Sequence, residues 1–278
     1  VSLLGSTETV NLNDPSSFNI GNGPWRWRDA QRTALREIYQ QSGSWLHGGG
    51  LQALDAMDIV NLNINGGYIP ENGAVYPDHE FGEQLQVLAQ MIKLDLGLQV
   101  ATVDLGGWDT HDAQGDGSNG YFADLVAELA GGLGAFYQDL DGGGSQNHAS
   151  RVTVVVQSEF GRELYENGDA GTEHGYGNLM LVLGGNVNGG FHGQFPGLAP
   201  GQLVDETDLG VTTDYRQILS EILVRRQGNA ALDVIFPNYQ GYEPLGIVQG
   251  TDIQDPGGSI FTDGFEGGTA DAWGASVG

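Results

Sequence analysis

The chain has 278 residues, enough for one large domain or two smaller ones with a sizeable core. Ten Lys and Arg against 36 Asp and Glu give a net charge of −26, which repels nucleic acid phosphates and anionic membrane surfaces. Cysteine is absent, which excludes disulfides, thiolate metal sites and cysteine nucleophiles. No apolar run is long enough to span a membrane, and no basic, apolar leader opens the chain. We therefore expect a soluble protein without a nucleic-acid partner, and any export signal would have been removed or would lie outside this sequence.

The first predicted helix covers about residues 24–41. Pro24 suits a first helical turn, and apolar residues recur at helical spacing at Trp27, Ala30, Ala34 and Ile38. An i, i+4 stripe of arginines lies on the same segment, formed by Arg28, Arg32 and Arg36. Such a stripe is typical of a solvated face that pairs with acidic neighbours, and the alternative is an anion site.

A loop is predicted at 61–77, where Asn, Gly and Pro are frequent. Asp78 can cap a second helix, whose apolar face carries Phe81, Leu85, Leu88 and Ile92. We expect this helix to belong to the core.

The middle of the chain alternates strand-like and helix-like segments. A strand at about 98–104 precedes a helix at about 121–140, and a second strand follows at 151–157. A third apolar run spans 179–183, and another helix covers 214–226. Strand, helix and strand with continuous β-branched runs predict an α/β fold, in which a mostly parallel sheet has helices on both faces.

We expect two regions along the chain. Residues 1–248 would form the α/β domain, and residues 249–278 an acidic, glycine-rich tail with one short strand at 259–261.

Three polar segments follow or precede predicted strands and carry candidate metal ligands. The first contains Asp109 and His111, with Asp104 as a secondary candidate; the second contains Glu159; the third contains His174, with Glu173 as a secondary candidate. Because ligands in such sheets bind beyond the carboxyl ends of strands, we expect the three segments to meet around one divalent cation, zinc or calcium. Each segment has an alternative role. Asp109 and His111 could be a hydrogen-bonded loop pair, Glu159 could form an ion pair with Arg162, and His174 could be a structural histidine.

A separate pattern resembles a calcium loop. Asp112, Gln114 and Asp116 place oxygen ligands at alternate positions, and Gly117 stands at the sixth. Ala123 occupies the twelfth position, where calcium loops have a bidentate Glu. The alternative is an ordinary polar turn.

Five motifs in a fixed order carry a family resemblance. They are Gly-Trp-Asp-Thr-His (107–111), Ser-Glu-Phe-Gly-Arg (158–162), Gly-Thr-Glu-His-Gly (171–175), Leu-Gly-Gly (183–185) and Thr-Thr-Asp-Tyr-Arg (212–216). Over about residues 80–240 the chain resembles the domain-of-unknown-function 1501 family, exported bacterial proteins that are similar to alkaline phosphatases and sulfatases. The resemblance implies an alkaline-phosphatase-like fold, a metal-dependent hydrolase of phosphate or sulfate esters, and an extracellular or periplasmic location.

The chain departs from that superfamily at several positions. Phe160 stands where sulfatases have a metal-binding histidine, and Glu173 where the family usually has Asp. Gly107 occupies the position four residues before His111, so Asp109 or Asp104 would replace the superfamily's aspartate. We also expect the chain to correspond to the carboxyl-terminal part of the fold, without the front strand that bears the nucleophile.

Two functions are compatible with these observations. The first is a metal-dependent hydrolase in which Asp109, His111, Glu159 and His174 hold the cation. The second is a non-catalytic structural subunit of an extracellular homo-oligomeric or filamentous assembly, which would self-associate through an exposed sheet edge. Between the two lies a processed enzyme whose front half stays bound as a separate chain.

Overall fold

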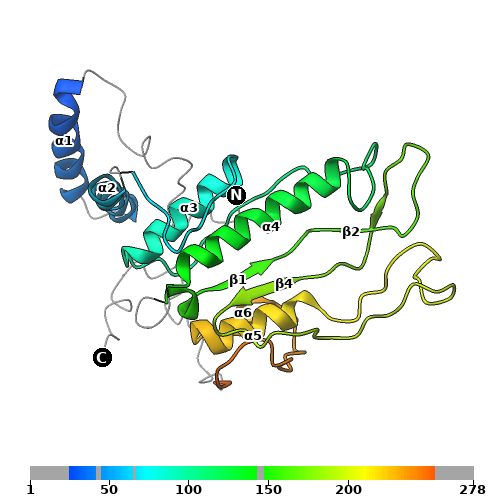
Figure 1. Cartoon of the computed structure of the whole chain (residues 1–278). Helices are drawn as coiled ribbons and strands as arrows, with labels where there is room; N and C mark the ends of the chain where they lie inside the picture. Colours follow the sequence, from blue (N-terminus) through cyan, green and yellow to red (C-terminus); the bar gives the residue numbers. More distant parts are fainter. Residues whose placement is uncertain (1–24, 42–44, 65–66, 143–146, 254–278) are drawn as a thin grey trace. The chain divides into compact units, whose positions relative to one another are not determined.

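The computed structural model describes residues 25–41, 45–64, 67–142 and 147–253 (Figure 1). The chain divides into two compact units. The first unit comprises Val1–Leu105 with Glu128–Gly142, and the second comprises Gly106–Ala127 with Gly143–Gly278. The predicted tail strand at 259–261 lies outside the described residues.

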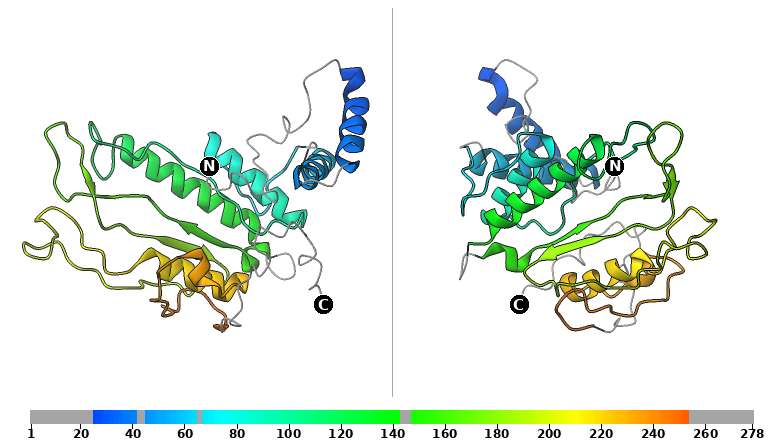
Figure 2. Two further views of the ribbon diagram at one scale, coloured as in Figure 1. Left: turned by 180° about the vertical axis from the view of Figure 1, so that it is seen from behind. Right: turned by 45° about the vertical axis from the view of Figure 1, so that its right-hand side comes forward.

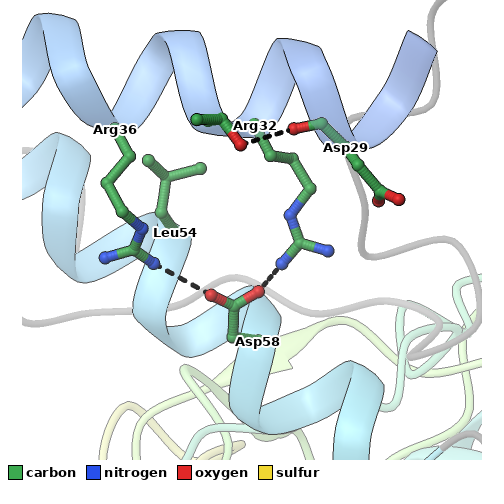
Figure 3. A pocket seen from close by; sticks show the side chains of 6 residues that line it. Asp29, Arg32, Arg36, Leu54 and Asp58 are labelled. Carbon is green, nitrogen blue, oxygen red and sulfur yellow. Dashed lines mark hydrogen bonds and ion pairs between the residues drawn. The ribbon is translucent and has the colours of Figure 1, made fainter.

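Helices α1 (Arg28–Gln40) and α2 (Trp45–Asn63) pack on each other in the first unit, and the short 3-10 helix η2 (Trp25–Trp27) precedes them. Arg32 and Arg36 of α1 point toward α2, where both pair with Asp58 (Figure 3). Arg36 also bonds Asp55, at 2.7 Å. Two of the three arginines of the stripe, Arg32 and Arg36, therefore pair with acidic neighbours, as predicted. The loop predicted from residue 61 begins later than expected, because α2 continues to Asn63.

Helices α3 (Glu80–Lys93) and α4 (Tyr121–Leu140) run side by side in both views (Figures 1 and 2). Gly132 of α4 lies against Phe81 and Leu85, so close that a side chain there would overlap the Phe81 ring. Phe81 and Leu85 are buried, as the helical spacing predicted. His79, and not Asp78, caps α3 by accepting from the Gly82 amide.

Asp139, near the end of α4, is fully buried and joins α3 to the preceding loop. Its carboxylate accepts hydrogen bonds from the hydroxyls of Tyr68 and Tyr76, each at 2.8 Å, and from the Glu71 amide at 2.7 Å. Lys93 completes the set with an ion pair of 2.6 Å. Four donors compensate the burial of one carboxylate, which makes this cluster the polar anchor of the loop.

In the second unit, strands β1 (Thr153–Val156) and β4 (Leu181–Gly184) pair antiparallel, with Thr153 opposite Gly184. The short 3-10 helix η4 (His148–Arg151) leads into β1. Helix α5 (Tyr215–Gln227) packs beside this pair through a core that contains Ile218, Ile247 and Val248. Asp214 caps α5, the left-handed Gly228 ends it, and the short α6 (Leu232–Ile235) follows.

Glu221 of α5 is fully buried and fixes the chain segment that follows α6. Its carboxylate accepts from the amides of Leu245, Gly246 and Val248, at 2.6 to 2.9 Å, and pairs with Arg225 at 3.0 Å. Three backbone amides on one carboxylate hold this segment over the core.

Two residues each form β2 (Gly161–Arg162) and β3 (His174–Gly175), a small antiparallel ladder in which Arg162 stands opposite His174. Both glycines are required, because a side chain on Gly161 would overlap the Gly177 backbone and one on Gly175 would overlap that of Arg162. This ladder brings the second and third predicted site segments together.

The prediction of a mostly parallel sheet with helices on both faces is wrong. The described residues form two small antiparallel sheets of two strands each, and residues 98–104 form neither helix nor strand. The β-branched run from Thr153 to Val156 does become a strand, but its partner is β4. A sequence pattern shows that a segment suits a strand, whereas the partner and its direction depend on which segments fold against it.

Within the described ranges, no helix is both long and apolar enough to cross a membrane. Self-association, predicted from an exposed sheet edge, stays a prediction.

Candidate metal centre

Three of the four predicted ligands lie together in the second unit. The ligand atoms of Asp109, His111 and His174 are all within 4.8 Å of one another, and the two imidazole rings lie 4.8 Å apart. Nε2 of His174 is 2.7 Å from Oδ1 of Asp109, and Nε2 of His111 is 3.0 Å from the same oxygen. Two imidazoles and a carboxylate thus converge on one point that is open to solvent, since the three side chains are 41 to 64% exposed.

Glu173 orients His111 from the other side. Its Oε2 is 2.7 Å from Nδ1 of His111, and its Oε1 accepts a 2.8 Å hydrogen bond from the Asn167 side chain. The same Asn167 amide also donates to the main-chain carbonyl of His111. Glu173 is therefore placed to support His111 as a candidate ligand, in an arrangement that is common at metal-binding histidines.

Asn167 is a residue that the sequence did not single out. Its side-chain oxygen accepts from the amides of Asp169 and Gly171, which folds residues 167–171 into a tight turn. Gly171 in turn lies directly on the His111 carbonyl, where a β-carbon would overlap it. The Asn-Gly-Asp sequence at 167–169 signals such a turn, but the pattern does not reveal which loop it supports.

Arg162 connects the segments that carry the ligands. Its guanidinium donates hydrogen bonds to the carbonyls of Trp108 and Thr172, and its NH2 group lies 3.6 Å from Oδ1 of Asp109. Phe160 lies between Arg162 and His174: its ring stacks on His174, with centroids 4.0 Å apart. Phe160 thus packs against a candidate ligand and offers no ligand atom itself.

Two carboxyl groups of the site are held ionised. The hydrogen bond from His174, together with the charge of Arg162, lowers the pKa of Asp109. The hydrogen bond from Asn167, with the nearby His111, lowers the pKa of Glu173. Both groups are therefore available as anions at neutral pH.

The other predicted site residues have different surroundings. Glu159 and Asp104 are exposed and are not members of the three-residue cluster formed by the described residues. Arg162 makes its carboxylate contact with Asp109, whereas the sequence alternative paired it with Glu159.

Gln114 and Asp116 of the proposed calcium loop already have hydrogen-bond donors. The Gln114 oxygen accepts from the hydroxyls of Thr110 and Thr172, and Oδ1 of Asp116 accepts from the amides of Ser118 and Asn119. The calcium loop stays a prediction.

The donor set fits a borderline divalent cation such as zinc. Bonds of about 2.0 Å to zinc place tetrahedral ligand atoms about 3.3 Å apart, so the observed 2.7 and 3.0 Å would need to widen only slightly. In addition, both ring nitrogens of His111 face carboxylate oxygens. A cation bound at Nε2 would leave the Nδ1–H group to donate to Glu173, which is the tautomer that a metal-binding histidine of this orientation needs.

In a comparison with protein families, the family described as protein of unknown function (DUF1501) matches residues 29–231. The chain belongs to this family. Neither the curated proteins nor the solved structures give a match. The matched region of this DUF1501 protein contains every residue of the metal cluster and its supports.

Proposed function

We propose that this DUF1501 protein is an exported, metal-dependent hydrolase of phosphate or sulfate esters. The observation that carries the proposal is the cluster of Asp109, His111 and His174, open to solvent and supported by Glu173. Three protein ligands with an accessible remaining position are typical of catalytic zinc sites, whereas structural sites are closed by four. The family resemblance supports the ester class and the export.

The roles of the residues follow from their contacts. Asp109, His111 and His174 would hold the cation, which would act as a Lewis acid on an ester oxygen. Glu173 fixes the tautomer and the orientation of His111.

Neither nearby hydroxyl is placed as an activated nucleophile. That of Thr110, a buried residue, donates to Gln114, and that of Ser158 donates to the Phe160 carbonyl. The proposal therefore assigns binding and orientation to this site and no covalent step to Thr110 or Ser158.

Metal titration together with ester hydrolysis tests the function. Zinc or cobalt(II) should bind with one equivalent per chain, and the loaded protein should release product from an aryl phosphate or an aryl sulfate. His174→Ala should weaken binding by more than about 100-fold, since it removes a ligand and not merely a support. His192→Ala is the matched control, because His192 bonds the Asn188 carbonyl. If the protein binds no metal at one equivalent per chain and hydrolyses neither ester, the proposal is refuted.

Export is tested separately by fractionating cells that produce the full-length protein. Recovery in the periplasm or the medium is expected, and recovery in the cytoplasm alone would contradict it.

A further inference from the structure

Arg162 occupies a position from which it contacts all three segments of the metal cluster. It is itself part of the second segment, in β2, directly opposite His174 in the ladder. Its two terminal nitrogens donate to Trp108, the neighbour of Asp109, and to Thr172, the neighbour of Glu173. Its side chain is only 17% exposed, so these bonds are largely shielded from water.

Main-chain bonds also join these segments. The Thr172 amide donates to the Thr110 carbonyl at 3.3 Å, and the Glu163 amide donates to the Glu173 carbonyl at 3.0 Å. Just beyond His111, the amides of Ala113 and Gln114 donate to the carbonyls of Asp169 and Ala170, at 3.0 and 2.9 Å. The segment from Gly106 to Thr110 has neither helix nor strand to fix it. Hydrogen bonds from a charged donor are stronger than neutral ones, so the guanidinium adds two strong bonds to these main-chain bonds, and one of them holds the Trp108 carbonyl.

We propose that Arg162 is the positioning residue of the metal centre, whose forked guanidinium sets the distance between Asp109 and His174. This inference rests on the proposed metal site and extends it to a residue that binds no metal itself. Phe160 stacks between Arg162 and His174, so the orientation of the His174 ring depends on the same side chain.

Electrostatics alone predicts the opposite effect on metal binding. The guanidinium lies 3.6 Å from Oδ1 of Asp109, and a positive charge beside a cation site repels the cation. If Arg162 acted only through its charge, removal of that charge would tighten binding. If it acts as a fork, removal weakens binding even when the charge is kept, because lysine cannot bridge two carbonyls in the same planar geometry.

The test compares Arg162→Lys, Arg162→Gln and the control Arg216→Lys by cobalt(II) titration, with zinc affinity measured by competition. Arg216 pairs with Asp214 at the start of α5 and serves as an arginine outside the cluster. Both Arg162 variants should lose affinity by about 10- to 100-fold, as for removal of ligand supports, and their cobalt absorption bands should shift or weaken. Unchanged affinity and spectrum in Arg162→Lys, or tighter binding in Arg162→Gln, would overturn the inference.

A metal-free measurement separates this inference from the proposed function. In the metal-free chain, amide hydrogen exchange at 106–112 and 170–176 should accelerate in Arg162→Lys and stay unchanged in Arg216→Lys. If the wild-type protein binds no metal, the function fails, while the exchange result still decides the role of Arg162. If the variants do not fold, hydrogen exchange of the Arg162 guanidinium protons is measured in the wild-type protein. These protons should exchange more slowly than those of the exposed Arg28. Equal exchange rates would overturn the inference.

Discussion

The carboxylate of Asp139 offers the sharpest test of how the first unit is held together. Asp139→Asn keeps the shape of the side chain but leaves one acceptor oxygen for four donors, and its amide group faces donors in place of the second oxygen. At least two donors then lose their acceptor, at about 1–3 kcal/mol each. Lys93 keeps its 2.9 Å pair with Glu71, which moderates the loss. We expect the free energy of unfolding to fall by about 3 kcal/mol.

Urea unfolding followed by circular dichroism measures this change, and amide hydrogen exchange at Glu71 reports the local bond. Asp124→Asn is the matched control, since Asp124 is exposed on the same helix and its replacement should change stability by about 0.5 kcal/mol or less. If Asp139→Asn is as stable as the control and Glu71 stays protected, the carboxylate is not the anchor described here.

The same group predicts a pH dependence. Burial acts to raise the pKa of Asp139, but hydrogen bonds from Lys93, Glu71 and the two tyrosines outweigh it, so the folded pKa is lowered. Its stabilising contribution is complete above the unfolded pKa of about 3.9 and is lost as the pH falls through the lower folded value. The unfolding free energy of the wild-type protein should therefore fall more steeply below about pH 4 than that of Asp139→Asn. Equal slopes in this range would contradict the assignment.

Three further changes test the site and the second unit. Glu173→Gln should weaken zinc binding by about 10- to 100-fold in a chelator competition, while Glu159→Gln, outside the cluster, should not; equal losses would place Glu159 among the ligands. Gly171→Ala should lower zinc affinity and accelerate amide exchange at 109–112, because its β-carbon would displace the His111 carbonyl. If the zinc affinity and the exchange rates both stay at their wild-type values, the loops are loosely packed. Glu221→Ala should lower the unfolding free energy by about 3–5 kcal/mol, measured by urea unfolding, since three amides lose their acceptor and Arg225 keeps only Asp252 as a carboxylate partner. A change under about 1 kcal/mol would mean that water replaces the lost carboxylate.

The sequence alone determined those features that depend on neighbouring residues. Helical spacing located α1, α3, α4 and α5, and the Val-rich run located β1. It also singled out Asp109, His111 and His174, because histidines and carboxylates amid glycines are recognisable wherever they stand. The sequence showed that these residues can bind a metal. Their proximity was inferred from a parallel sheet that the structure does not contain.

Only the tertiary structure decided how the segments pair. Residues 98–104 suit a strand in pattern but have none, and β1 finds an antiparallel partner instead of a parallel one, because a ladder needs a second segment that folding must deliver. The same reason explains the site: Arg162 and Asn167 act through hydrogen bonds to loops far away in sequence, at Trp108 and His111. A sequence pattern can identify a donor of such a bond, but its acceptor is chosen by the fold.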